Sequence, residues 1–145
     1  MYTRTVNIGR DVDLLKLPAH LAARLHDIHA RTVEINQNQV SFTGALFGFG
    51  NRWDLLVPFG FGDLTIDTNA LQLSYRLSFR QLMIVTSVMV GIIAGVACSM
   101  FRSWEGLVIF PFGWTWLVGG NLAIGLPRFK KFIDSAIETA PRLGR

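Results

Sequence analysis

The chain has 145 residues, of which 50% are hydrophobic and 17% are charged, and its formal net charge is +4. Charged residues make up about a quarter of an ordinary soluble domain. The deficit lies between Gln81 and Leu126, where only Arg102 and Glu105 are charged. The basic residues are dispersed through the N-terminal part and cluster beside this apolar stretch. Membrane topology explains that distribution better than nucleic-acid binding, so no nucleic-acid partner is expected. With Cys98 alone, the chain can form no intrachain disulfide and no cysteine-based metal site.

The first eighty residues predict a small α+β domain that is antiparallel, β-rich and contains one or two helices. Tyr2–Ile8 alternates as a strand does, and Asp11–His29 spaces its apolar residues three and four apart, as a helix that Pro18 could divide. Thr32–Phe42 and Asp63–Phe79 each alternate on both sides of polar turn residues. Each of these two segments therefore predicts a β-hairpin.

A Phe-Gly-Phe-Gly sequence occurs twice between the predicted hairpins, with its aromatic residues at Phe47, Phe49, Phe59 and Phe61. Neither copy is a phosphate-binding loop, because the remaining glycine, lysine and hydroxyl positions of those motifs are missing. Two interpretations stay open. The glycines could permit tight turns while the phenylalanines pack in the core, or the phenylalanines could form an apolar surface that contacts the membrane or a partner.

Two uncharged segments of about twenty residues follow, at 82–101 and 107–126. Each is long enough to cross roughly 30 Å of hydrocarbon, and the short link between them would make them antiparallel neighbours. The sequence therefore predicts a two-helix transmembrane hairpin. Basic residues flank the hairpin at Arg76, Arg80, Arg128, Lys130 and Lys131. By the positive-inside rule, both termini are expected in the cytoplasm, beneath the plasma (inner) membrane.

The first apolar segment carries small residues at four-residue intervals, namely Ser87, Gly91, Gly95 and Ser99. Such a stripe lets two helix backbones approach closely. The stripe could pack on the second segment, which offers Gly120 and Asn121, or on another chain. Asn121 is the one strongly polar side chain in the two segments, and we expect its amide to be hydrogen-bonded because an unpaired amide in hydrocarbon is costly.

Trp114 and Trp116 lie near the middle of the second apolar segment. Tryptophan favours the membrane interface, where its ring is apolar at one end and wet at the other. Two mid-segment rings therefore indicate contact with protein or with a pigment, or else exposure to lipid or packing within the hairpin.

The last segment, 127–145, predicts an amphipathic helix. Phe129, Phe132, Ile133 and Ile137 fall on one face, and Lys130 and Lys131 lie off it. Pro127 would bend this helix away from the second apolar segment, so that it lies on the anionic inner leaflet. The alternative is that its apolar face packs on the apolar loops of the N-terminal domain.

The predicted organisation is thus a cytoplasmic α+β domain at 1–80, a hairpin at 81–126 and an amphipathic tail at 127–145. No nucleophile elbow is present, and His26 and His29 lack a third metal ligand. We therefore expect no enzyme and can name no cofactor. The leading hypothesis is an accessory or structural subunit of a larger membrane protein complex, whose partners are lipids and other membrane subunits. The alternative is a membrane-tethered binding or regulatory module that recognises lipid headgroups or a cytoplasmic protein.

Overall fold

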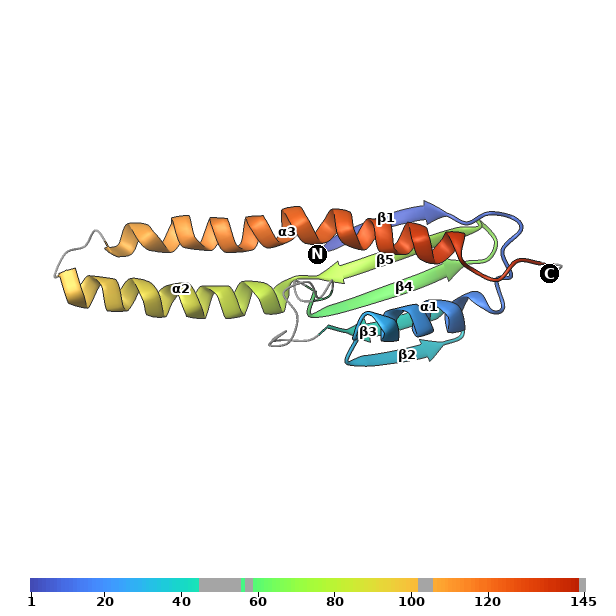
Figure 1. Cartoon of the computed structure of the whole chain (residues 1–145), viewed down its shortest axis with the longest axis horizontal. Coiled ribbons are helices and arrows are strands. Elements are labelled where there is room, and N and C mark those ends of the chain that lie inside the picture. The colour runs from blue at the N-terminus through green and yellow to red at the C-terminus, as the bar shows by residue number, and fades with distance from the viewer. Residues whose placement is uncertain (45–55, 57–58, 102–105, 144–145) are drawn as a thin grey trace.

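The computed structural model describes residues 1–44, 56, 59–101 and 106–143. Five strands form one sheet in the order β1-β5-β4-β3-β2, and every neighbouring pair is antiparallel. Figure 1 shows this sheet at one end of an elongated molecule, with two long helices extending from it. The elements, in chain order, are β1 (Tyr2–Asn7), α1 (Leu17–Asp27), β2 (Thr32–Asn36), β3 (Gln39–Thr43), β4 (Phe61–Asp67), β5 (Gln72–Ser78), α2 (Arg80–Phe101) and α3 (Gly106–Glu138).

The alternation of apolar and polar residues assigns each strand residue to one of two faces. Val40, Leu64 and Tyr75 are cross-strand neighbours on the inner face, and all three are buried. The positions next to them along each strand are polar and lie on the opposite face, which no described helix covers. A sheet with one face on the core and one face in water is common among antiparallel sheets. The predicted α+β class and both predicted hairpins are confirmed.

Local polar chemistry closes the turns. The Asp67 carboxylate accepts hydrogen bonds from the backbone N–H groups of Asn69 and Ala70, both at 3.0 Å, and so fixes the turn between β4 and β5.

Pro18 lies in the first turn of α1, where a missing N–H costs nothing because the first N–H groups have no partner within the helix. Pro18 therefore starts the helix and does not divide it.

One face of the sheet is covered by α1 and by the C-terminal part of α3, which lie side by side across it (Figure 1). From α1, Leu17, Leu21 and Leu25 reach this core, and from α3, Phe129 and Ile133 do, all with no exposed surface. The apolar face of residues 127–140 therefore forms, together with α1, the helical layer that covers this face of the sheet. Of the two alternatives for this segment, packing on the N-terminal domain is the one observed, although the packing is on the sheet itself.

The predicted two-helix transmembrane hairpin is wrong. Among the described residues, α2 alone is long and apolar enough to cross a membrane, over Arg80–Met100, judged by length and composition. The second segment is also not a separate helix: it continues into the tail as one helix of 33 residues with Pro111 and Pro127 inside it. The predicted bend at Pro127 is also wrong. Phe129, Ile133 and Ala136 are buried in the core of the domain, and this part of α3 stays in line with the rest.

Candidate functional site

The most distinctive feature of the molecule is an apolar helical arm, which we define as α2 together with residues 106–126 of α3. The two helices run antiparallel, side by side, away from the sheet (Figure 1). Small side chains mediate part of their contact, because Ala94 and Ala97 are buried, and a Cβ at Gly113 would lie 3.4 Å from a methyl group of Val90. Close backbone approach of this kind maximises dispersion contacts between helices.

A side-chain hydrogen bond joins the two helices among the described residues of the arm. Trp114 donates from its indole Nε1 to the Ser87 hydroxyl at 3.0 Å. Trp114 therefore packs within the arm, which is one of the alternatives that the sequence leaves open. Ser87 likewise faces the neighbouring helix, which is one of the two alternatives that the sequence leaves open for the stripe of small residues.

The other members of the stripe do not all make this contact. A Cβ at Gly91 would meet only the Phe110 ring, at 3.9 Å, and a Cβ at Gly95 would meet nothing within 4 Å. Ser99 is exposed and its hydroxyl donates to the Val96 carbonyl of its own helix at 2.7 Å. From Ser87 to Ser99, the stripe thus passes from the contact between α2 and α3 to the outer surface of the arm.

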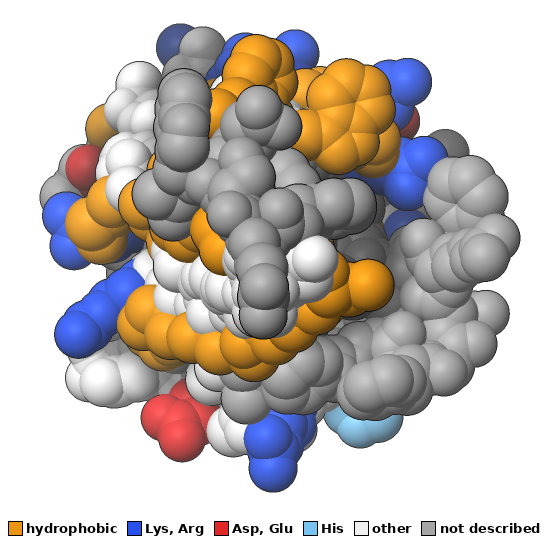
Figure 2. Space-filling model, turned by 90° about the vertical axis from the view of Figure 1, so that its left-hand side faces the viewer, with side chains coloured by type: hydrophobic (Ala, Val, Ile, Leu, Met, Phe, Trp, Pro, Cys, Tyr) orange, Lys and Arg blue, Asp and Glu red, His pale blue; other side chains and the backbone are white. Residues whose placement is uncertain are grey.

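Most of the outer surface of α2 is apolar and uncovered within the chain. Only 17% of the candidate span is buried. The large exposed hydrophobic residues of α2 are Met83, Ile84, Val88, Met89, Ile92, Ile93, Val96 and Met100. Figure 2, which looks at the molecule from the free end of the arm, shows described hydrophobic side chains around this end and charged ones towards the rim of the view. Contiguous apolar surface of this kind marks a membrane or protein contact.

A shallow hollow of about 310 Å³ lies on the outer face of α3, lined by Phe112, Thr115, Trp116, Gly119, Gly120 and Ala123. Trp116 and Phe112 are 81% and 76% exposed, and a Cβ at Gly119 or Gly120 would meet nothing within 4 Å. Trp116, unlike Trp114, therefore points away from α2. Asn121 does not join the hollow, because its amide donates to the Leu117 carbonyl of the same helix at 2.6 Å.

The aromatic residues of the Phe-Gly-Phe-Gly sequences have different positions. Phe59 has no exposed surface and lies in the core, so it is not a partner or membrane contact. Phe61 is partly exposed on the open face of the sheet, opposite Ser78. Phe47 and Phe49 lie outside the described residues.

The residues that were expected to bind the tail to the membrane surface also differ in their burial. Phe129 is fully buried, with its ring centroid 5.3 Å from that of Phe59 and 5.5 Å from that of Tyr75. It is therefore a core residue and not a membrane contact. Phe132 packs at the edge of the same core, while Lys131 is exposed and Lys130 is partly exposed.

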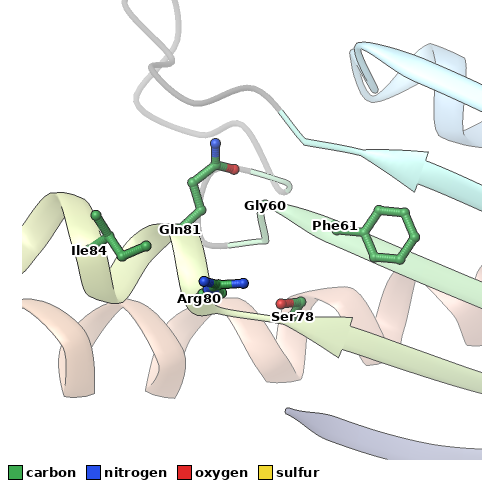
Figure 3. Close-up of a pocket in the computed structure, with 6 residues that line it drawn as sticks. All are labelled: Gly60, Phe61, Ser78, Arg80, Gln81 and Ile84. Atoms are coloured by element: carbon green, nitrogen blue, oxygen red, sulfur yellow. The ribbon is translucent and has the colours of Figure 1, made fainter.

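A second cavity, of about 310 Å³, lies where the sheet passes into the arm. Figure 3 shows its lining: Gly60 just before β4, Phe61 at the start of β4, Ser78 at the end of β5, and Arg80, Gln81 and Ile84 in the first turns of α2. We call this the joint cavity. The sequence indicated Arg80 as a topology signal, and it placed Arg80 and Gln81 as the only joint between the last predicted strand and the first apolar segment. It did not indicate Ser78 or a cavity at this joint.

A further group of polar residues, formed by Tyr2, Arg4 and Tyr75, lies on the inner face of the sheet. Burial raises the pKa of Tyr75 to about 12, and the neighbouring Tyr2 adds to this shift. Arg4 lies opposite Tyr75, and a hydrogen bond with Tyr2 raises its pKa further above the usual range. Both shifts keep the groups in their ordinary protonation states at neutral pH, so neither gives a proton-transfer residue. Among the described residues, no three His, Cys, Asp or Glu side chains could hold a metal ion together.

No family model, curated protein or solved structure matches this chain.

Proposed function

We propose that this chain is a membrane-anchored accessory subunit of a larger membrane protein complex. The helical arm carries the anchor, α2, and the α+β domain sits at the membrane surface. The observation that carries the proposal is the contrast between the two ends of the molecule. The domain closes its core with residues of both α1 and α3, whereas the arm leaves the apolar side chains of α2 uncovered.

The apolar surface of α2 favours lipid as one neighbour of the arm. Ile84, Val88, Ile92 and Val96 follow one another at four-residue intervals and are each 52% to 63% exposed. In water, a stripe of this length would be an aggregation site. In a bilayer, the apolar side chains of the stripe contact hydrocarbon instead of water. The helix can lie there because every backbone polar group inside it is already hydrogen-bonded.

The hollow on α3 favours a protein as a second neighbour. Trp116 projects beside Gly119 and Gly120, which leave room for the side chains of another helix. Small residues on a helix surface let the backbone of a second helix approach closely, so that dispersion contacts hold the two helices together. An apolar helix of a partner subunit fits this hollow, and this favours the accessory subunit over a module that only binds lipid.

The basic residues favour one orientation of the molecule. Arg80 begins α2, and Arg128, Lys130 and Lys131 lie in the part of α3 next to the sheet. All four therefore lie towards the domain end of the arm. Cytoplasmic flanks are enriched in such residues, so the domain end is proposed to face the cytoplasm from the inner membrane.

Fractionation of cells that express the full chain tests the anchor. The chain should remain with the membranes after washing with alkaline carbonate, which strips peripheral proteins. Ile92→Lys should release it, because a lysine at a helix centre costs about 2.5–3.5 kcal/mol on insertion. Thr65→Lys, on the exposed face of β4, is the matched control and should stay with the membranes. Recovery of the wild-type chain in the carbonate wash would overturn the membrane anchor.

Co-purification in mild detergent tests the partner. The chain should recover membrane proteins in a fixed ratio, and Gly119→Ile, which fills the hollow on α3, should reduce this recovery. Ile124→Leu is the control, because Ile124 is exposed on α3 but does not line the hollow. An anchored chain that recovers no membrane protein would overturn the accessory subunit and leave the lipid-binding module.

A further inference from the structure

The joint cavity combines polar and apolar walls. Ser78, Arg80 and Gln81 supply a hydroxyl, a guanidinium and an amide, while Phe61 and Ile84 supply apolar surface (Figure 3). Gly60 helps to keep this geometry, because a Cβ there would lie 2.7 Å from the Cβ of Gln81. The cavity therefore has hydrogen-bond donors and a hydrophobic wall side by side.

The donors of the cavity are free to bind a ligand. In the described part of the chain, the side chains of Ser78, Arg80 and Gln81 have no hydrogen-bond or ion-pair partner. Arg80 is exposed, and its fork of N–H groups matches the geometry of a phosphate. The N-terminal end of the α2 dipole adds positive potential at the same place. The charge of the cavity thus suits an anion.

The apolar wall of the cavity continues along α2. Ile84 begins the exposed stripe that runs through Val88 and Ile92 to Val96. Twelve residues of helix rise about 18 Å, and the hydrocarbon of one leaflet is about 15 Å deep, half of the bilayer's roughly 30 Å. A molecule with its anionic group at Arg80 would therefore find apolar surface over the depth of one leaflet.

We infer that the joint cavity is a binding site for an anionic phospholipid. The headgroup phosphate accepts hydrogen bonds from Arg80, Ser78 and Gln81, and one acyl chain lies along Ile84 and Val88. This inference rests on the proposed membrane anchor, because the apolar stripe meets lipid only if α2 is in the bilayer. A free phosphate would use the donors but not the stripe.

Lipid titration of the delipidated full-length protein, followed by native mass spectrometry, tests the site. Phosphatidylglycerol should bind in preference to phosphatidylcholine. Arg80→Gln should lower the affinity for phosphatidylglycerol about fivefold, the factor that corresponds to ~1 kcal/mol for one basic residue near anionic lipid. Arg76→Gln is the matched control, because Arg76 is an exposed arginine on β5 outside the cavity. It should leave the affinity unchanged.

Two further measurements separate the possible ligands. Ile84→Ala should weaken binding of long-chain phosphatidylglycerol and leave a dihexanoyl analogue unaffected. Displacement of the bound lipid by millimolar inorganic phosphate would overturn the lipid assignment in favour of a soluble phosphate.

The experiments can overturn the lipid site without overturning the membrane anchor. Equal binding of both lipids, or an equal loss in Arg80→Gln and Arg76→Gln, would overturn the site while the carbonate wash still supports the anchor. Arg80→Gln itself should stay with the membranes, because α2 keeps its apolar length. Release of the wild-type chain by carbonate would instead overturn the proposed function.

Discussion

Phe129 links the C-terminal part of the chain to the sheet. Its ring is fully buried and packs on Phe42, Phe59 and Tyr75, with centroids 5.3 to 5.8 Å apart. We expect Phe129→Ala to lower the free energy of unfolding by about 3–5 kcal/mol, the usual range for a fully buried ring. Phe132→Ala, at the edge of the core, should cost clearly less. Chemical denaturation monitored by circular dichroism measures both, and equal losses would contradict the assigned positions.

Gly62 shows how one missing side chain shapes the core. The Phe42 ring occupies the space where a Gly62 Cβ would lie, and a Leu77 methyl group is 3.1 Å from that position. Gly62→Ala should therefore destabilise the domain by about 1–3 kcal/mol, as overpacking of a core does. Thr65→Ala, on the exposed face of the same strand, is the control for a substitution by alanine that does not enter the core. A thermal melt in which the two variants coincide would contradict this account.

Tyr75 gives the domain a pH dependence in alkali. Burial raises its pKa to about 12 in the folded chain, whereas the unfolded value is near 10. Between these two values the folded state holds a proton that the unfolded state has lost, so stability falls as pH rises from about 10 towards 12. Below pH 10 this contribution is fully present. Tyr75→Phe should flatten this part of the stability curve, and an unchanged slope would show that another group titrates.

At the scale of the elements, the contact between α2 and α3 is local. Gly113→Ile should separate the two helices, because a Cβ at Gly113 already reaches a Val90 methyl group at 3.4 Å. Gly95→Ile is the control, since its Cβ would meet nothing within 4 Å. In detergent, the first variant should lower the melting temperature and change the tryptophan fluorescence of the chain, because the hydrogen bond from Trp114 to Ser87 depends on this contact. A larger effect of Gly95→Ile would place the helix contact elsewhere.

At the scale of the whole molecule, α3 is part of both the helical arm and the domain. Residues 106–126 of α3 pack on α2, and the residues after Pro127 cover the sheet. The arm and the domain are therefore joined twice, through the β5–α2 joint and through the uninterrupted α3. We expect this double connection to fix the orientation of the arm relative to the domain.

This double connection predicts the effect of truncation. A chain that ends after Leu126 should lose cooperative unfolding of the domain, because it lacks Phe129, Ile133 and Ala136 from the core. A chain that ends after Leu143 should unfold like the full chain, since it keeps the Arg142–Asp11 ion pair at 3.1 Å. Limited proteolysis and thermal melts measure the difference. A folded, protease-resistant product of the shorter chain would show that α1 alone can cover the sheet.

The sequence by itself determined the strands, both hairpins, α1 and the apolar length of α2. These features depend on patterns within a few residues, such as the alternation of Val40 and Phe42, and local chemistry decides them. Only the tertiary structure decided the position of the tail and the joint cavity. An apolar helix face with Phe129 and Ile133 suits a bilayer surface and a protein core equally well. The buried rings of Phe42, Phe59 and Tyr75 provide the core. The joint cavity likewise brings Gly60 and Phe61 to Arg80 across about twenty residues of chain, through the pairing of β4 with β5, and no local pattern records that proximity.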